Sequence, residues 1–174
     1  VSDYLAPRPV ALDRMLSRSQ ATASGRFGLE AGLCHWFGMD MSREAPPVAP
    51  LTYCFDTGQS ADGYLLRADP VHLRADQSVL RLFDAGTFNI LQQEADQLVD
   101  SFNRFYAGQG LRLQAPCPQR WYLLQEQPPE LATTPLMSVV GQDIDACLPQ
   151  GVYAADWHRL LNDVKMLFHE HAVN

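Results

Sequence analysis

The spacing of the apolar residues changes repeatedly along this 174-residue chain, and this change limits the possible folds more than any other feature. The clearest spacing is helical, because apolar residues recur at steps of four and three through 91–105. This stripe consists of Leu91, Ala95, Leu98, Phe102 and Phe105. Asn89 with Gln92 resembles a capping box, and Gly108 or Gly110 is placed to end the helix. We therefore predict an amphipathic helix near the middle of the chain.

Shorter apolar runs, some alternating with polar residues, lie on both sides of this helix. They cover 64–67, 71–74 and 79–83 before it, and 111–114 and 121–125 after it. Such runs are typical of short strands separated by turns. The order of helices, strands, helix, strands and helix predicts an α+β fold, with a mostly antiparallel sheet of about four to five short strands.

The N-terminal part differs from the rest of the chain. Residues 1–45 show two stretches of helical spacing, the second ending near Gly38. The segment 46–50 is rich in proline, which is typical of a connector. Residues 51–174 carry the strands, a short helix from Thr134-Pro135 and a long helix from about Tyr153 to His171. We predict a single α+β domain over 1–174 with these three parts, and the chain ends suggest a fragment of a longer protein.

Charge and cysteine content exclude several classes of protein. Thirteen basic residues against twenty acidic ones leave a net charge of −7, whereas non-specific nucleic-acid binding needs clustered positive charge. No apolar run approaches the roughly 18–20 residues of a membrane span. The four cysteines form no Cys-x-x-Cys pair of the kind found in structural zinc sites. We expect a cytoplasmic protein that binds neither nucleic acid nor membrane.

The densest polar cluster lies at 67–76, with the sequence Arg-Ala-Asp-Pro-Val-His-Leu-Arg-Ala-Asp. Its candidate binding residues are Arg67, Asp69, His72, Arg74 and Asp76. If 71–76 is extended, the last three share one face, because side chains alternate along a strand. A histidine beside an arginine and a carboxylate can bind an anion or transfer a proton. The alternative is an ordinary solvated face of an antiparallel strand.

A second polar stripe lies on the predicted C-terminal helix. It consists of His158, Asn162, Lys165 and His169, and His171 follows two residues later. Steps of four, three and four place the first four residues on one face, where they can reach a ligand or a partner helix. The zinc-protease motif His-Glu-x-x-His is absent. The alternative is a set of solvent-facing side chains near a helix C-terminus, where the helix dipole favours histidine.

Sequence signatures of common catalytic sites are missing. The chain contains no Gly-x-x-x-x-Gly-Lys-Ser/Thr, no Gly-x-Gly-x-x-Gly and no Gly-x-Ser-x-Gly. Phosphate-binding loops and serine nucleophile elbows therefore have no support in the sequence.

The decapeptide 67–76 resembles a signature of the RpfE-type regulatory proteins of proteobacteria. Weaker matches extend the similarity over roughly residues 10–174, at Glu94-Ala95, Asn103, 118–123, 133–136, 160–163, 166–167 and 169–171. Asp163 and Lys165 depart from the family, in which we expect glutamate and glutamine. The resemblance implies that this chain is the N-terminal half of a longer protein.

Members of this family are commonly described as cofactor-independent phosphoglycerate mutases, which implies a second possible function. Such an enzyme holds two metal ions with aspartates and histidines around a serine nucleophile. The residues available as ligands are Asp69, His72, Asp76, His169 and His171. No serine stands in a recognisable context beside them, and no histidine has the Arg-His-Gly motif of cofactor-dependent mutases.

We therefore expect a non-catalytic binding or regulatory domain that uses the two polar clusters as contact surfaces. Its partner would be a protein, a small anionic ligand, the missing C-terminal half or a second copy of the chain. The alternative is part of a phosphoglycerate mutase-like phosphoryl-transfer enzyme with a divalent metal as cofactor. A third candidate is a homodimerising structural domain whose exposed helix face is its interface.

Overall fold

The computed structural model describes residues 14, 17–18, 29–40, 46–76 and 79–171. The chain divides into two compact units, Val1–Pro46 and Pro47–Asn174. In the first unit, helix α2 spans Leu29–Trp36 and is followed by Gly38 with a positive φ of 83°, which confirms the second predicted N-terminal helix and its end. Most of the other predicted N-terminal helix falls outside the described residues.

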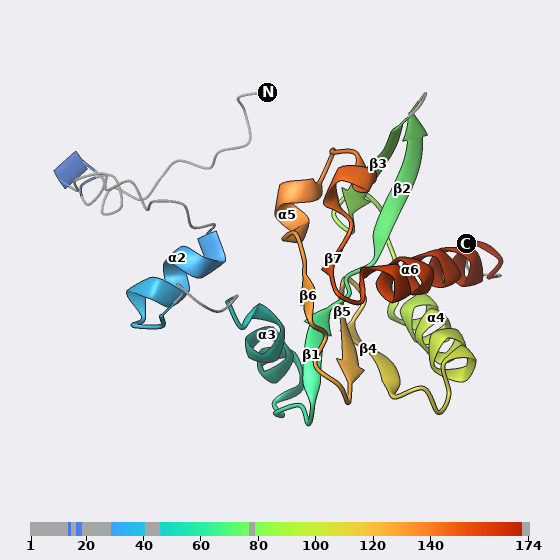
Figure 1. The fold of residues 1–174 in the computed structure, drawn as a ribbon. Helices are drawn as coiled ribbons and strands as arrows, with labels where there is room; N and C mark the ends of the chain where they lie inside the picture. The colour runs from blue at the N-terminus through green and yellow to red at the C-terminus, as the bar shows by residue number, and fades with distance from the viewer. Residues whose placement is uncertain (1–13, 15–16, 19–28, 41–45, 77–78, 172–174) are drawn as a thin grey trace. The chain divides into compact units, whose positions relative to one another are not determined.

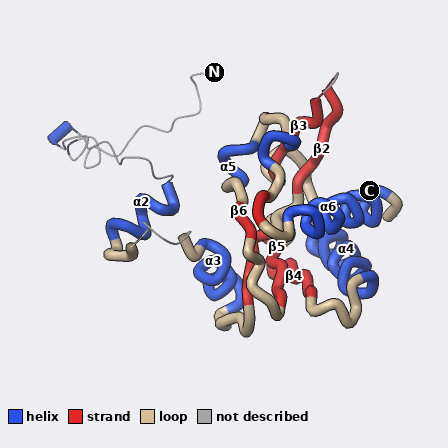
Figure 2. Tube along the Cα trace, viewed as in Figure 1, coloured by secondary structure: helices blue, strands red, loops and turns tan. Residues whose placement is uncertain are grey.

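The second unit has an α+β fold, as the sequence predicted. Its elements are α3 (Val48–Thr57), β1 (Tyr64–Arg67), β2 (Val71–Asp76), β3 (Val79–Asp84), α4 (Gln92–Phe105), β4 (Leu111–Cys117), β5 (Arg120–Gln125), β6 (Leu131–Ala132), α5 (Leu136–Val139), the 3-10 helix η1 (Ile144–Cys147), β7 (Gln150–Gly151) and α6 (Ala154–His169). The strands form three small antiparallel sheets, with the orders β1-β5-β4, β2-β3 and β6-β7. Figure 2 distinguishes the strands, in red, from the helices, in blue.

Helix α3 begins inside the segment that the sequence predicted to be a connector. Pro47 occupies the N-cap position and Pro50 lies in the first turn. The backbone N–H groups of a first turn have no partner within the helix, so proline costs little there. The helix ends at Gly58, whose φ of 69° is left-handed and whose N–H donates to the carbonyl of Cys54 at 2.8 Å. Proline content alone therefore misidentified the start of a helix.

The hydrophobic core lies between the three-stranded sheet and two helices, α4 and α6 (Figure 1). Its buried residues are Ala95, Leu98, Val99, Phe102, Tyr106, Leu113, Trp121 and Leu123. From α6, a half-buried stripe packs against it, made of Trp157, Leu160, Val164, Leu167 and Phe168. The predicted α4 stripe is correct at its centre but not at its ends, because Leu91 and Phe105 are 57% and 55% exposed.

Helix α4 also begins differently from the prediction. The backbone N–H of Leu91 donates to Glu94 Oε2 at 2.7 Å, so Leu91 is the N-cap and the Asn89–Gln92 cap does not form. A glutamate at the third helical position stabilises the helix, because its carboxylate accepts from a free N–H group and lies at the positive end of the helix dipole. The short helix predicted from Thr134-Pro135 is α5, which begins one residue later than a threonine cap would place it, because its N-cap is Pro135 and has no side-chain bond.

The outer edge of β4 is closed by side chains of α4. The Asn103 carboxamide accepts from the Leu113 N–H at 2.8 Å and donates to the Leu113 carbonyl at 3.0 Å. Gln92 Nε2 donates to the carbonyl of Ala115 at 2.8 Å. An unpaired strand edge is a template for association with other chains, and these amides occupy it.

Replacing Asn103 by alanine should lower the free energy of unfolding by about 2 kcal/mol, because the buried Leu113 would lose partners for both its backbone groups. Urea denaturation measures this loss. Asp100→Ala is the matched control on the same helix, where an exposed side chain should change stability by less than about 0.5 kcal/mol. Equal effects of the two substitutions would contradict the role assigned to Asn103.

Candidate functional site

The polar decapeptide 67–76 is divided between two places in the fold. Arg67 ends β1 and Asp69 follows it, and both contribute to a half-buried network against β5 and α3. His72, Arg74 and Asp76 lie on one face of β2 and are all exposed. The structure therefore separates the first two candidates from the last three.

Arg67 and Asp69 are paired with each other. Arg67 donates to both carboxylate oxygens of Asp69, from Nε at 3.1 Å and from Nη2 at 2.5 Å. Asp69 Oδ1 also accepts from the backbone N–H of Trp121 at 3.1 Å. The Arg67 guanidinium lies 5.5 Å from the centre of the Tyr122 ring, and its Nη1 donates to Thr52 Oγ1 at 3.3 Å. Both side chains are thus engaged in holding β1 to its neighbours.

A second ion pair beside this one was missed by sequence reasoning. Asp56, in the last turn of α3, binds both Arg120 Nη2 and Arg120 Nε, the latter at 2.6 Å. Tyr122 donates its hydroxyl proton to Asp56 Oδ2, also at 2.6 Å. The Asp56 side chain is 5% exposed. No motif marks this cluster, because its residues come from α3 and β5 and meet only in the folded chain.

The charges of this network shift the pKa values of its members. Burial acts to raise the pKa of Asp56, but the hydrogen bonds from Tyr122 and Arg120 and the charges of Arg120 and Arg67 together hold it below its usual 3.8. Burial, followed by the hydrogen bond to Asp56, raises the pKa of Tyr122 to about 12. The carboxylate therefore stays ionised and the phenol stays protonated at neutral pH.

These properties indicate that the network is structural and holds α3 against the sheet. Tyr122 is completely buried, so its hydroxyl cannot reach a substrate. Each carboxylate already has its own guanidinium, which leaves neither a free base nor a free anion site. Tyr106 plays a similar part elsewhere, since its hydroxyl donates to Asp163 Oδ2 at 3.2 Å and joins α4 to α6.

The face of the β2–β3 ribbon carries a different set of charges. Arg81 donates from Nε to Asp76 Oδ2 at 2.9 Å and from Nη1 to the carbonyl of Gly141 at 2.9 Å. Arg74 lies directly opposite Arg81 in the register, where two like charges repel. Among the described residues, no carboxylate pairs with Arg74. His72 lies beside it, with its ring centre 6.4 Å from that of Phe88.

The two edges of this ribbon also differ. The outer edge of β3 is paired, since the Leu82 N–H donates to the carbonyl of Gln142 at 3.2 Å and the Leu82 carbonyl accepts from Gly141 at 2.7 Å. The outer edge of β2 has no neighbouring strand within the described part of the chain. In Figure 1 the ribbon extends away from the three-stranded sheet. Within the described residues, the ribbon therefore combines a cation that has no carboxylate partner with an open strand edge.

The second predicted cluster lies on α6. His158 Nε2 donates to the carbonyl of Pro149 at 2.9 Å, so its ring is hydrogen-bonded to the segment that precedes the helix. Asn162, Lys165 and His169 are exposed, and His171 is half-buried just beyond the helix. The three exposed residues share one face, as the spacing predicted, and their side chains form no ion pair within the described part of the chain.

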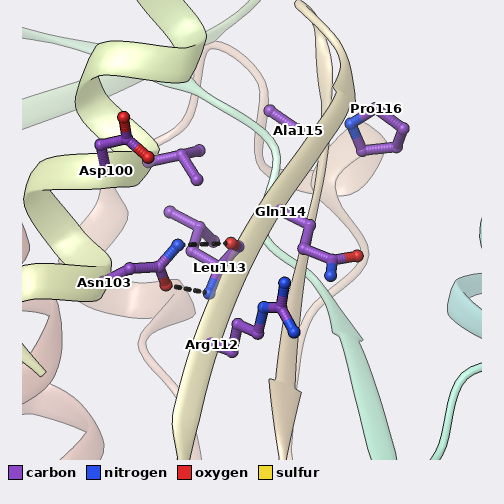
Figure 3. Close-up of a pocket in the computed structure, with 8 residues that line it drawn as sticks. Asp100, Asn103, Arg112, Leu113, Gln114, Ala115 and Pro116 are labelled. Atoms are coloured by element: carbon purple, nitrogen blue, oxygen red, sulfur yellow. Dashed lines mark hydrogen bonds between the residues drawn. The ribbon is translucent and has the colours of Figure 1, made fainter. Parts of the chain in front are cut away.

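A groove of about 340 Å³ lies between α4 and β4 (Figure 3). It is lined by Val99, Asp100, Asn103 and the strand residues 112–116. Its floor contains the two hydrogen bonds between Asn103 and Leu113. The groove is formed where α4 covers the edge of β4. Its lining residues do not form a recognisable catalytic arrangement.

The structure does not gather the residues considered as metal ligands. In the described ranges, no three His, Cys, Asp or Glu side chains come together in a group that could hold a metal ion. Asp69 is engaged by Arg67, and Asp76 by Arg81.

Across the described ranges, none of the helices has the length and apolar character needed to cross a bilayer.

Comparison with protein-family models, with curated proteins and with solved structures finds no match to this chain.

Proposed function

We propose that this chain is a non-catalytic, protein-binding domain of an RpfE-type regulatory protein in the cytoplasm, and that the β2–β3 ribbon is its contact surface. The observation that carries the proposal is the exposed Arg74, which has no carboxylate partner in the described residues and stands on a strand with an open edge. Arg67, the other arginine of the candidate set, is paired with Asp69 inside the fold. The likeness of 67–76 to the family signature supports the regulatory part, and four free thiols fit a reducing compartment.

A photo-crosslinking residue at position 72 tests the contact surface in cells of the source organism. We expect a discrete crosslinked protein, identified by mass spectrometry, and its loss when Arg74→Glu is added. Position 62 is the control, because Asp62 is exposed and lies before β1, outside the ribbon. The same products from both positions would contradict the proposal. Products from position 165 alone would move the contact to α6.

The non-catalytic part of the proposal has its own test. The purified chain, supplied with Mn²⁺ and 3-phosphoglycerate, should form no 2-phosphoglycerate above the rate measured with metal and buffer alone. Turnover that disappears in a His72→Ala variant would overturn the proposal in favour of a phosphoryl-transfer enzyme.

A further inference from the structure

The backbone of β2 presents hydrogen-bonding groups to solvent at alternate residues. In an antiparallel pair, a residue whose N–H and C=O point outward faces a partner whose groups also point outward. Leu82 of β3 points its groups toward 141–142, so Leu73, its partner in the register, points its own groups away from β3. Val71 and Ala75 do the same, because the pattern repeats every two residues. These three residues form an edge that can accept another strand.

The side chains beside this edge set the chemistry of what can bind there. The backbone groups of Arg74 are turned toward β3, so an added antiparallel strand would face Arg74 in a non-hydrogen-bonded pair, where side chains approach most closely. The neighbouring cation Arg81 is already paired with Asp76, so Arg74 is the charge that a bound segment would neutralise. An acidic side chain is therefore favoured opposite Arg74. On the other face, Leu73 is half-buried beside the buried Leu82, which favours apolar residues at the alternate positions.

Resting on the function proposed above, we propose that the partner protein contributes an extended segment that adds to β2 as a third, antiparallel strand of the ribbon. The segment alternates acidic and apolar residues, with an acidic residue opposite Arg74. Its main chain supplies affinity through the open edge, and its side chains supply specificity.

A second copy of this chain fits the edge less well. In a two-fold symmetric dimer, β2 of one copy would pair with β2 of the other. Only two registers keep most of the strand paired, and they place Arg74 opposite His72 or opposite Arg74 of the other copy. Neither register supplies the negative charge that Arg74 lacks. Each copy also carries a net charge of −7.

The test uses the whole protein and a synthetic peptide of alternating glutamate and valine, about ten residues long, the upper range of natural strands. We expect saturable binding in fluorescence anisotropy, and none for a peptide N-methylated at alternate residues, which cannot pair with a strand. Arg74→Glu should weaken binding by at least about tenfold. Ala75→Pro should abolish it, because proline removes an outward N–H from an edge strand, a position where proline is tolerated. Ala75→Val keeps that N–H and should bind normally.

Four results would overturn strand addition. They are equal binding of the N-methylated peptide, equal binding of a lysine–valine peptide, full binding by a folded Ala75→Pro protein, and a concentration-dependent dimer in sedimentation that Ala75→Pro dissociates. Circular dichroism and thermal unfolding establish that each variant is folded. If position 72 crosslinks to a partner protein and the same crosslink forms in the Ala75→Pro variant, the ribbon is the contact surface but the partner does not bind by strand addition. If crosslinking also fails, both proposals fall.

Discussion

Replacing Trp121 by alanine should lower the free energy of unfolding by about 4 kcal/mol, the largest single effect we expect in this chain. Trp121 lies on the central strand β5 and is 2% exposed. Its ring meets Phe168 of α6 edge to face, with 6.0 Å between centres. Its indole N–H donates to the carbonyl of Pro118 at 2.7 Å. The substitution therefore leaves a cavity, an unpaired carbonyl and a helix without its main aromatic contact.

Chemical denaturation measures this loss, and amide hydrogen exchange should show that α6 loses protection first. Met137→Ala is the control, because Met137 is a large apolar residue that is 72% exposed on α5. That substitution should change stability by less than about 0.5 kcal/mol. A Trp121→Ala protein as stable as the control would refute the packing of α6 on β5.

Replacing Asp56 by alanine should cost about 3 kcal/mol, the lower part of the range for breaking a buried ion pair, because Arg120 remains 35% exposed and can be partly hydrated. The buried Tyr122 hydroxyl would also lose its acceptor. A carboxylate at a helix C-terminus is unfavourable by itself, so Asp56 is explained only by its partners on β5. Asp62→Ala, at an exposed carboxylate, should be nearly neutral. Similar losses in the two variants would show that the network does not stabilise the fold.

The same ion pair predicts how stability depends on pH. Because the pKa of Asp56 is lower in the folded chain than its ordinary 3.8, the unfolded chain binds the proton more readily. The stabilisation is therefore complete above about pH 4 and is lost as the pH falls through the folded pKa. The difference in unfolding free energy between the natural chain and Asp56→Asn should shrink over that interval. A difference that grows on acidification would contradict the direction of the shift.

Local spacing was sufficient to predict most of the secondary structure. The strands β1, β2 and β3 and the helices α4 and α6 have strong periodicity, and each formed where the apolar pattern placed it. Helix α3 was missed because its prolines suggested a connector, although one is a cap and the other lies in the first turn. The strands β6 and β7 have two residues each, which is too short for a period to be visible.

The candidate site was predictable only in part, because a pattern gives the face of a strand but not the partners of its side chains. Alternation correctly placed His72, Arg74 and Asp76 on one exposed face of β2. The same decapeptide gave no sign that Arg67 and Asp69 turn to an inner network, because that depends on β5 lying beside β1. Which edge of the ribbon is covered likewise depends on residues 141–142, which pair with β3 and are distant from it in sequence.

The open edge of β2 is the premise of both proposals, and amide hydrogen exchange of the free protein by NMR tests it most directly. The N–H groups of Val71, Leu73 and Ala75 should exchange rapidly, whereas those of His72 and Arg74, paired with β3, should be protected. This alternation is the result that we predict. Equal protection of Leu73 and Arg74 would show that the edge is already covered, and the assignment of the ribbon as a free binding surface would be wrong.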